Sequence, residues 1–432
     1  MKFRVEHDTL ADAVAWVARA LPSRPVVPVL SGLRLDAGEG EGLTLSCFDY
    51  ELSATAHLPA DVAEPGAALV PGRLLAEITR SLPGQPAEFR SDGDEVTLIC
   101  GSAEFALVSL PTAEYPALPP EPPLAGTVDG GELAAAVAQV LPATSRDDTL
   151  PMLTAVCLDI RGEVMALAAT DRYRLAVRDL NWQPADPQVR AIALVPARTL
   201  ADAARVMEPG VPVTLAFSAP PAAPGRQGDP RPVEGMIAFS SGGRRLTGRL
   251  IAGEFIRYES RFPAGYGCWA EVPAASLIEA VRRVSLVADR ASPVRLTFEP
   301  GTVTLEAQTE GRARAVERVV ASFHGDEPVI SFNPHYLLDG LTAAAAGAGP
   351  ARHPAGTGGG AEDEAAAGET APGGSASPAV AAAIRLEFTS PAKPALITPA
   401  GTPGNAGNER DEVPTRPAFR YLVVPLRSPA RA

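Results

Sequence analysis

Apolar side chains recur at helical spacing in three separate stretches of the chain. In the first stretch, Leu10, Val14, Val17 and Leu21 fall on one face of a helix, with mostly small residues between them. The other two stretches have the same kind of apolar stripe. Each therefore predicts an amphipathic helix that buries one face against other elements. The three stretches are residues 9–21 (TLADAVAWVARAL), 131–141 (GELAAAVAQVL) and 275–290 (ASLIEAVRRVSLVADR).

A second kind of segment, a short apolar strand that runs into a helix, also occurs three times. Pro71, Pro196 and Pro334 stand at the same place in the copies, where a fixed φ and a missing N–H suit the start of a helix. The copies are ALVPGRLLAEITRSL from Ala68, ALVPARTLADAARVM from Ala193 and ISFNPHYLLDGL from Ile330.

The strands between these helices repeat as well, as PVLSGLRLD (28–36), PMLTAVCLD (151–159) and PVRLTFEP (293–300). Each unit then has the order helix, strands, helix, strands, so both helices can cover one face of a sheet, which is an α+β arrangement. We predict three repeated α+β domains, at 1–122, 127–253 and 254–432. Two segments poor in large apolar side chains are expected to be loop insertions: 219–234 in the second domain and 343–383 in the third.

The composition narrows the class of protein. Among the 432 residues, no stretch approaches the ~20 apolar residues that cross a bilayer, and the charged start MKFRVEHDTL is unlike a signal peptide. We therefore expect a cytoplasmic protein without membrane contact. Its four cysteines are far apart, with no interleaved histidine, which predicts buried thiols and no metal site. No cofactor is expected.

The net charge of −13 argues against nucleic-acid binding only if the charge is evenly distributed. The six predicted helices together carry eight Arg against seven Asp or Glu, a net of +1, which leaves −14 for the rest of the chain. This asymmetry is modest but has the sign that a DNA-facing set of helices would need.

Seven segments, in order along the chain, resemble one family, the bacterial DNA sliding clamps (DNA polymerase III beta subunit). The resemblance implies paired helices on curved antiparallel sheets, and a head-to-tail homodimer that closes a ring around duplex DNA. It also implies a processivity factor without catalytic residues. The segments are MKFRVEHDTL (1–10), LPSRPVVPVLSGLRL (21–35), EFALVSLPTAEYP (104–116), ATDRYRLAV (169–177), FNPHYLLDGL (332–341), FTSPAKPALIT (388–398) and YLVVPLR (421–427).

By this resemblance, Phe105 and Leu107 of one protomer pack against Leu286 of the next, although an ordinary core position remains the alternative for Phe105. The helices and their short flanking loops would line the DNA channel and contact phosphates without reading sequence. The alternative for each arginine is an ordinary solvated helix charge. The candidate DNA contacts are Arg24, Arg73, Arg80, Arg146, Arg198, Arg205, Arg282 and Arg283.

The resemblance also implies a groove that binds short linear motifs of the polymerase III alpha subunit, the clamp loader and repair polymerases. For its leucines and valines, core packing is the alternative interpretation. The matching positions are Leu153, Thr170, Arg172, Tyr173, Arg174, Leu175, Ile256, Asn333, Tyr336, Pro394, Val423, Val424, Pro425, Leu426 and Arg427.

Four of the family's usual groove residues differ here. Ile256 replaces a proline, Arg172 and Tyr173 replace the common Gly and His, and Ala291 replaces a larger side chain. A diverged paralogue with an altered pocket is therefore the alternative function, either a peptide-binding scaffold or a clamp copy that evades an inhibitor. An enzyme is a poor alternative, because the sequence contains no GxSxG, HExxH or phosphate-loop motif.

Overall fold

A computed structural model describes residues 1–40, 42–205, 207–218, 231–232, 235–288, 292–309, 311–326, 328–347, 382–400 and 417–426. The chain divides into two compact units. One unit contains residues 1–171 and 178–256, and the other contains residues 172–177 and 257–432. Most of the predicted insertion 219–234, and residue 291, lie outside the described residues.

The first repeat packs helices α1 (His7–Arg19) and α2 (Gly72–Ser81) beside each other. Leu10, Val14 and Val17 of α1 are fully buried, which confirms the face that their spacing predicts. A five-stranded antiparallel sheet runs in the order β5-β1-β7-β8-β9, and the other strands follow as β4-β3-β2-β6. The strands are β1 (Lys2–Val5), β2 (Gly32–Gly38), β3 (Gly42–Phe48), β4 (Leu52–Leu58), β5 (Asp61–Glu64), β6 (Gly66–Pro71), β7 (Ala87–Asp92), β8 (Glu95–Cys100) and β9 (Ala103–Val108).

The second repeat has the same design, with α3 (Gly130–Val140) against α4 (Ala197–Ala204). In one sheet β14, β10, β16, β18 and β19 follow in order, and β19 pairs with β4 of the first repeat. In another, the order is β17-β15-β11-β12. The strands are β10 (Leu124–Asp129), β11 (Ala155–Arg161), β12 (Val164–Thr170), β14 (Gln183–Pro184), β15 (Arg190–Pro196), β16 (Pro212–Phe217), β17 (Arg231–Pro232), β18 (Met236–Ser241) and β19 (Arg244–Arg249).

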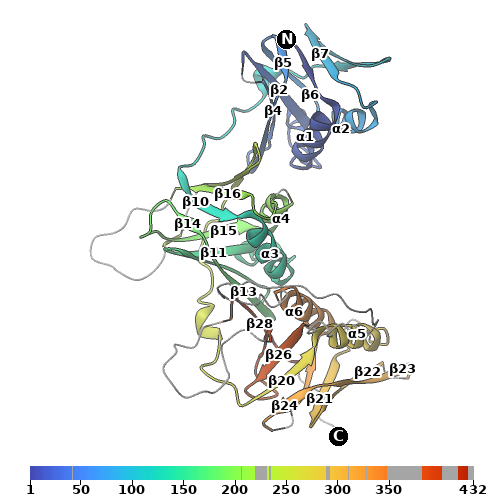
Figure 1. The fold of residues 1–432 in the computed structure, drawn as a ribbon, viewed down its shortest axis with the longest axis vertical. Coiled ribbons are helices and arrows are strands. Elements are labelled where there is room, and N and C mark those ends of the chain that lie inside the picture. The colour runs from blue at the N-terminus through green and yellow to red at the C-terminus, as the bar shows by residue number, and fades with distance from the viewer. Residues whose placement is uncertain are drawn as a thin grey trace, which may run out of the picture. The chain divides into compact units, whose positions relative to one another are not determined.

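The third repeat packs α5 (Ala274–Ser285) against α6 (Pro334–Gly347), so the helices of each repeat form a pair (Figure 1). Its sheets have the orders β23-β22-β21-β25 and β28-β27-β26-β20-β24. β13 (Arg174–Asn181) contributes residues to both units. The other strands are β20 (Cys268–Pro273), β21 (Val294–Glu299), β22 (Thr302–Thr309), β23 (Ala313–Val320), β24 (Ser322–His324), β25 (Val329–Phe332), β26 (Ala383–Phe388), β27 (Ala395–Pro399) and β28 (Phe419–Val423).

The three prolines mark helix starts as predicted. Pro71 and Pro196 hold the N-cap positions of α2 and α4, and Pro334 is the first residue of α6. One predicted boundary is wrong. The insertion expected from Ala343 cannot begin there, because α6 continues to Gly347 and buries Ala343 and Ala344. Alanine is the best helix former, so the alanine run extends the helix. The remaining part, 348–381, lies outside the described residues.

Candidate functional site

The candidate DNA-contacting arginines of the first repeat are exposed at the paired helices. Arg73 and Arg80 project from α2, and Arg24 lies in the loop after α1. The Arg73 guanidinium donates a hydrogen bond to the Pro22 carbonyl at 3.2 Å. In the described part of the chain, Arg24, Arg80 and the exposed loop residue Arg146 form no ion pair, so their charges face solvent.

The candidate arginines of α4, of its C-terminal cap and of α5 are exposed too, but they lie near carboxylates of their own chain. Asp202 lies 3.8 Å from Arg198 and 3.4 Å from Arg205. On α5, Arg282 is 2.7 Å from Glu279, and Arg283 makes a two-pronged contact with Glu317 of β23 at 2.6 and 3.1 Å. The hydrogen bonds from Arg283 lower the pKa of Glu317, and the same contact raises the pKa of Arg283.

The predicted positive excess of the helices is not present. Within their observed bounds the six helices carry six Arg against seven Asp or Glu, a net of −1. The sign changes because α1 begins early enough to include Asp8, α4 ends before Arg205, and α5 ends before both Asp289 and Arg290. Arg19, in the last turn of α1, is also exposed, although it was not among the predicted DNA contacts. Whether these helices bind DNA therefore depends on which of their charges are already paired.

β9 of the first repeat and β23 of the third repeat are edge strands, as β5 and β25 are at the opposite edges of the same two sheets. β9 is the outermost strand of its five-stranded sheet, and β23 is the outermost strand of its four-stranded sheet. Val108 on β9 is 70% exposed, and Val320 on β23 is 76% exposed. Open edges with exposed valines are a template for pairing with another chain.

The three residues predicted at the protomer interface differ in their burial. Leu286, at the end of α5, is 84% exposed, which is unusual for a leucine and fits an interface position. Phe105 on β9 is half-buried. Leu107 is only 2% exposed and belongs to the core of its own repeat, because it faces inward where Phe105 and Val96 also pack. Leu107 can therefore contribute to such an interface only indirectly, by holding β9 in place, because almost none of its side chain is accessible to a partner protomer.

One cluster within residues 172–177 and 257–432 brings together several predicted groove residues. The Arg174 guanidinium lies 4.5 Å from the centre of the Tyr336 ring and pairs with Asp339 of α6. Tyr173 also stacks on Tyr336, with the two ring centres 6.0 Å apart. The Tyr421 hydroxyl donates to the Tyr336 carbonyl at 2.8 Å. Asp339, which was not among the predicted residues, thus helps to fix the arginine and the tyrosine.

The backbone around this cluster is tied together by hydrogen bonds. The Val424 N–H donates to the Tyr173 carbonyl at 2.9 Å, and the Leu426 N–H donates to the Ser331 carbonyl at 2.7 Å. Asn333 caps α6, since its side-chain oxygen accepts from the N–H groups of His335 and Tyr336. Residues distant in sequence therefore meet at the start of α6 and the end of β28.

Three apolar side chains of this region remain open to solvent: Tyr173 is 51% exposed, Leu426 39% and Val424 37%. By contrast, Leu175 and Val423 are buried in the core, as the alternative interpretation holds for them. We define Tyr173, Val424 and Leu426 as the exposed wall. Arg172, beside it, has a positive φ of 80°, a conformation that glycine adopts more easily.

The remaining predicted groove residues are mostly buried or half-buried. Leu153 and Thr170, in the first unit, are buried, at 5% and 4% exposure. Ile256, the last residue of that unit, and Pro394, next to β27, are half-buried, whereas Pro425 is buried. Arg427 lies outside the described residues.

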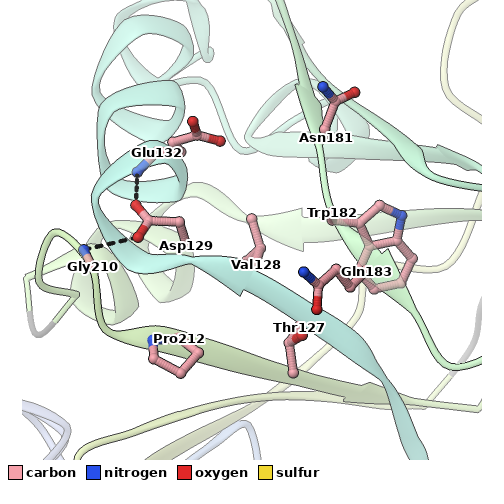
Figure 2. Close-up of a pocket in the computed structure, with 9 residues that line it drawn as sticks. All are labelled: Thr127, Val128, Asp129, Glu132, Asn181, Trp182, Gln183, Gly210 and Pro212. Atoms are coloured by element: carbon pink, nitrogen blue, oxygen red, sulfur yellow. Dashed lines mark hydrogen bonds between the residues drawn. The ribbon is translucent and has the colours of Figure 1, made fainter. Parts of the chain in front are cut away.

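A cavity of about 360 Å³ lies elsewhere, within the second repeat (Figure 2). Asp129 accepts from the Glu132 N–H at 2.9 Å and from the Gly210 N–H at 2.8 Å, and these hydrogen bonds lower the pKa of its carboxyl. The Trp182 indole N–H donates to the Gly162 carbonyl. These polar groups already serve the local fold, as a helix cap and a strand contact. The lining residues are Thr127, Val128, Asp129, Glu132, Asn181, Trp182, Gln183, Gly210 and Pro212.

The four cysteines are buried free thiols, as their spacing predicts. Burial raises the pKa of Cys47 to about 12, so this thiol stays protonated at neutral pH. The described ranges contain no group of three or more His, Cys, Asp or Glu side chains that could hold a metal ion. Nor does any helix in them have the length and apolar character needed to span a membrane.

Comparison with solved structures places this fold in the class of DNA polymerase sliding clamps. The clamp of Bacillus subtilis superposes with a TM-score of 0.79 at 23% identity, over 99% of each chain. Sequence comparison then identifies the family. Family profiles for the N-terminal, central and C-terminal domains of the DNA polymerase III beta subunit match residues 1–119, 127–256 and 259–347. The chain belongs to the DNA polymerase III beta subunit family, the beta sliding clamps.

Two relatives are similar over much of their length. The beta sliding clamp of Streptomyces coelicolor is 45% identical over 99% of both chains. A beta sliding clamp homolog from Streptomyces muensis, GriR, is 44% identical over 79% of this chain and 88% of its own.

Proposed function

We propose that this chain is a sliding clamp: a non-catalytic homodimeric ring that encircles duplex DNA and tethers polymerases during synthesis. Family membership along the whole chain carries this proposal. A ring needs two complementary ends on each protomer, since head-to-tail contacts close only when each end meets the other. The open edges β9 and β23, in the first and third repeats, would be those ends. Because DNA is the partner, we place the protein in the cytoplasm with the chromosome.

Topology supplies the test. A ring held by topology alone, once loaded, stays on a nicked circular duplex and leaves when one cut linearises the circle. We expect retention on circles in high salt, where direct phosphate contacts are screened. Equal retention on circular and linear DNA would contradict the proposal.

We further propose that the exposed wall binds linear motifs of the polymerase III alpha subunit, the clamp loader and repair polymerases. Exposed aromatic and aliphatic side chains beside a fixed arginine suit the apolar anchors of such peptides. In Val424→Asp, bound peptide would desolvate an unpaired carboxylate, so affinity should fall at least about 30-fold, roughly 2 kcal/mol. Val329→Asp is a matched control, because Val329 is similarly exposed, at 39%. Peptide binding is measured by fluorescence anisotropy.

The diverged-paralogue alternative depends on Arg172 and Tyr173 at positions where Gly and His are usual. Tyr173 stacks on Tyr336 and belongs to the exposed wall, and Arg172 precedes it in the chain, so the altered positions are at the proposed binding surface. A ring that is retained on circles but binds no polymerase peptide would favour this alternative. Binding of the alpha-subunit motif at micromolar concentration would contradict it.

A further inference from the structure

Two of the three tryptophans in this chain have an arginine of the same chain over the ring. The guanidinium carbon lies 5.7 Å from the ring centre in one case and 4.2 Å in the other. In both cases a carboxylate pairs with the arginine, so a cation is held between an aromatic ring and an acid. The two groups are Trp16 with Arg244 and Asp12, and Trp269 with Arg385 and Glu271.

The third tryptophan, Trp182, lines the cavity of the second repeat. No arginine or lysine among the described residues lies over its ring. Its indole N–H donates to the Gly162 carbonyl at 2.8 Å, and its ring packs so closely on Gly126 that a Cβ there would lie 2.5 Å from a ring carbon. The indole is therefore held in place, and it can offer a ligand only its aromatic surface.

Two carboxylates line the same cavity at the start of α3. Figure 2 shows Asp129 and Glu132 on one side of it and Trp182 on the other. The exposed Glu132 carboxylate forms no hydrogen bond or ion pair with the described residues. Asp129 accepts one backbone N–H on each oxygen, which lowers its pKa and leaves each oxygen able to accept a further donor. Both acids can therefore contact a cation in the cavity.

The remaining lining suits a cation that is attached to an apolar stem. Thr127, Asn181 and Gln183 contribute hydroxyl and amide groups, and these side chains form no hydrogen bond with other described residues. Val128 and Pro212 contribute apolar surface. No lysine or arginine lines the cavity. The lining therefore has negative charge, spare acceptors and an aromatic ring, but no cation of its own.

One basic residue, Arg178 of β13, acts on Glu132 from outside this lining. The Arg178 charge is within electrostatic reach of the Glu132 carboxylate, but the two side chains form no ion pair. Burial is the largest effect on Arg178 and lowers its pKa. Two carboxylates against this one neighbouring guanidinium leave the local charge negative, which favours a cationic ligand.

We propose that this cavity binds an aliphatic cation, a guanidinium or ammonium group on an apolar stem. Asp129 and Glu132 hold the charged head, and Trp182 contacts the cation and its stem, as the other two tryptophans contact arginines of the chain. A cavity of about 360 Å³ is large enough for such a group. The cation comes either from a basic side chain of a partner protein or from a free polyamine. The site lies beyond the proposed clamp function, since it contains none of the predicted DNA-contacting or groove residues.

Fluorine NMR of protein that carries fluorotryptophan tests the site directly, because the three tryptophans supply one probe at the cavity and two internal controls. The probes are spermidine and a blocked Gly-Arg-Gly peptide, in about 0.15 M salt to screen weak attraction to the acidic surface. Each active probe should shift the Trp182 resonance with a Kd below about 1 mM and leave those of Trp16 and Trp269 in place. The matched peptide with citrulline, which replaces the guanidinium by an uncharged urea group, should not shift it.

Two variants locate the contact. Glu132→Gln removes one carboxylate from an exposed position and should raise the Kd at least about fivefold. Asn181→Arg places a guanidinium of the chain itself at the cavity and should prevent binding of either probe. Glu77→Gln is the matched control, because it makes the same charge change on α2 and should leave the Kd unchanged. Circular dichroism establishes that every variant is folded.

The outcomes decide between a cation site and general attraction to an acidic protein. A saturable Trp182 shift that needs the positive charge and weakens in Glu132→Gln supports the proposal, and the probe that binds at the lower concentration identifies the source of the cation. Failure of both probes to shift Trp182 overturns it. Equal shifts of all three tryptophans, equal binding of the citrulline peptide, or equal effects of Glu132→Gln and Glu77→Gln also overturn it. None of these results depends on whether the protein forms a ring.

Discussion

Helices α2 and α5 each present two arginines, yet the structure leaves these arginines in different states. Arg73 and Arg80 of α2 have no carboxylate partner among the described residues, and Arg73 contacts only a backbone carbonyl. Arg282 and Arg283 of α5 are held by Glu279 and Glu317. The two sequences are alike in charge, but only the first helix offers cations that a phosphate could contact without breaking an ion pair.

The difference shows how a sliding protein can limit its direct affinity for DNA. A ring is retained by topology, so many strong phosphate contacts are unnecessary and would slow its movement along DNA. Intramolecular carboxylates that occupy arginines reduce the number of phosphates neutralised, and with it the salt-sensitive part of the affinity. The comparison therefore predicts unequal contributions from helices with equal numbers of arginines.

The largest expected effect comes from removing both arginines of one helix. The slope of log K against log salt is negative, and Arg73→Ala with Arg80→Ala should reduce its absolute value by nearly 2, at about 0.9 per phosphate contact. Arg282→Ala with Arg283→Ala changes the net charge equally and should reduce the absolute value of the slope by less than about 1. Fluorescence anisotropy with a short duplex, over a series of salt concentrations, measures both slopes. Equal slopes would contradict the comparison.

A smaller effect should follow from releasing Arg283. In Glu317→Gln the two-pronged contact is lost, the arginine can reach solvent, and direct duplex affinity should rise about threefold. Glu77→Gln is the matched control, since it neutralises one exposed acid on α2 without releasing an ion pair seen in the structure. If both variants bind DNA with the same affinity, the increase comes from the change in net charge and not from the release of Arg283.

The smallest effect concerns stability against pH. Arg283 lowers the pKa of Glu317 below its usual value of 4.5. A lowered pKa in the folded protein gives stability that is present above the unfolded-state pKa and is lost as the pH falls through the folded-state value. Wild type should therefore melt about 1–2 °C above Glu317→Gln at pH 7, with the gap closing toward pH 3. Scanning calorimetry at the two pH values measures the gap, and a gap that widens on acidification would refute the assignment.

The helices were predictable because their information is local. The stripe of Leu10, Val14 and Val17 identifies the buried face of α1, and Pro71 and Pro196 mark where α2 and α4 begin. The end of α6 was not predictable from composition. Alanines can continue a helix or belong to a chain without a core, and packing around Ala343 and Ala344 decides between these possibilities.

For the candidate sites as well, some features were predictable from the sequence and others were not. The resemblance named Arg174 and Tyr336, but it did not name Asp339, which fixes the arginine from the next turn of α6. It also grouped Val423 with Val424, although Val423 is the last residue of the fully buried strand β28, whereas Val424 follows the strand and is 37% exposed. Leu107 and Phe105 lie on the same face of the edge strand β9, yet Leu107 is buried and Phe105 is half-buried, a difference that the sequence pattern does not reveal.

By itself, the sequence determined the threefold repeat, the α+β class, the faces of the helices and the family, since these depend on residue types at fixed local spacings. Only the tertiary structure decided which charges remain available. Glu317 is 34 residues from Arg283, and Asp12 of α1 meets Arg244 of β19 across 232 residues. An ion pair depends on distance in space, which folding sets by joining strands and helices remote in sequence. The same arginine can therefore be a free cation or half of a pair, and no local pattern distinguishes the two.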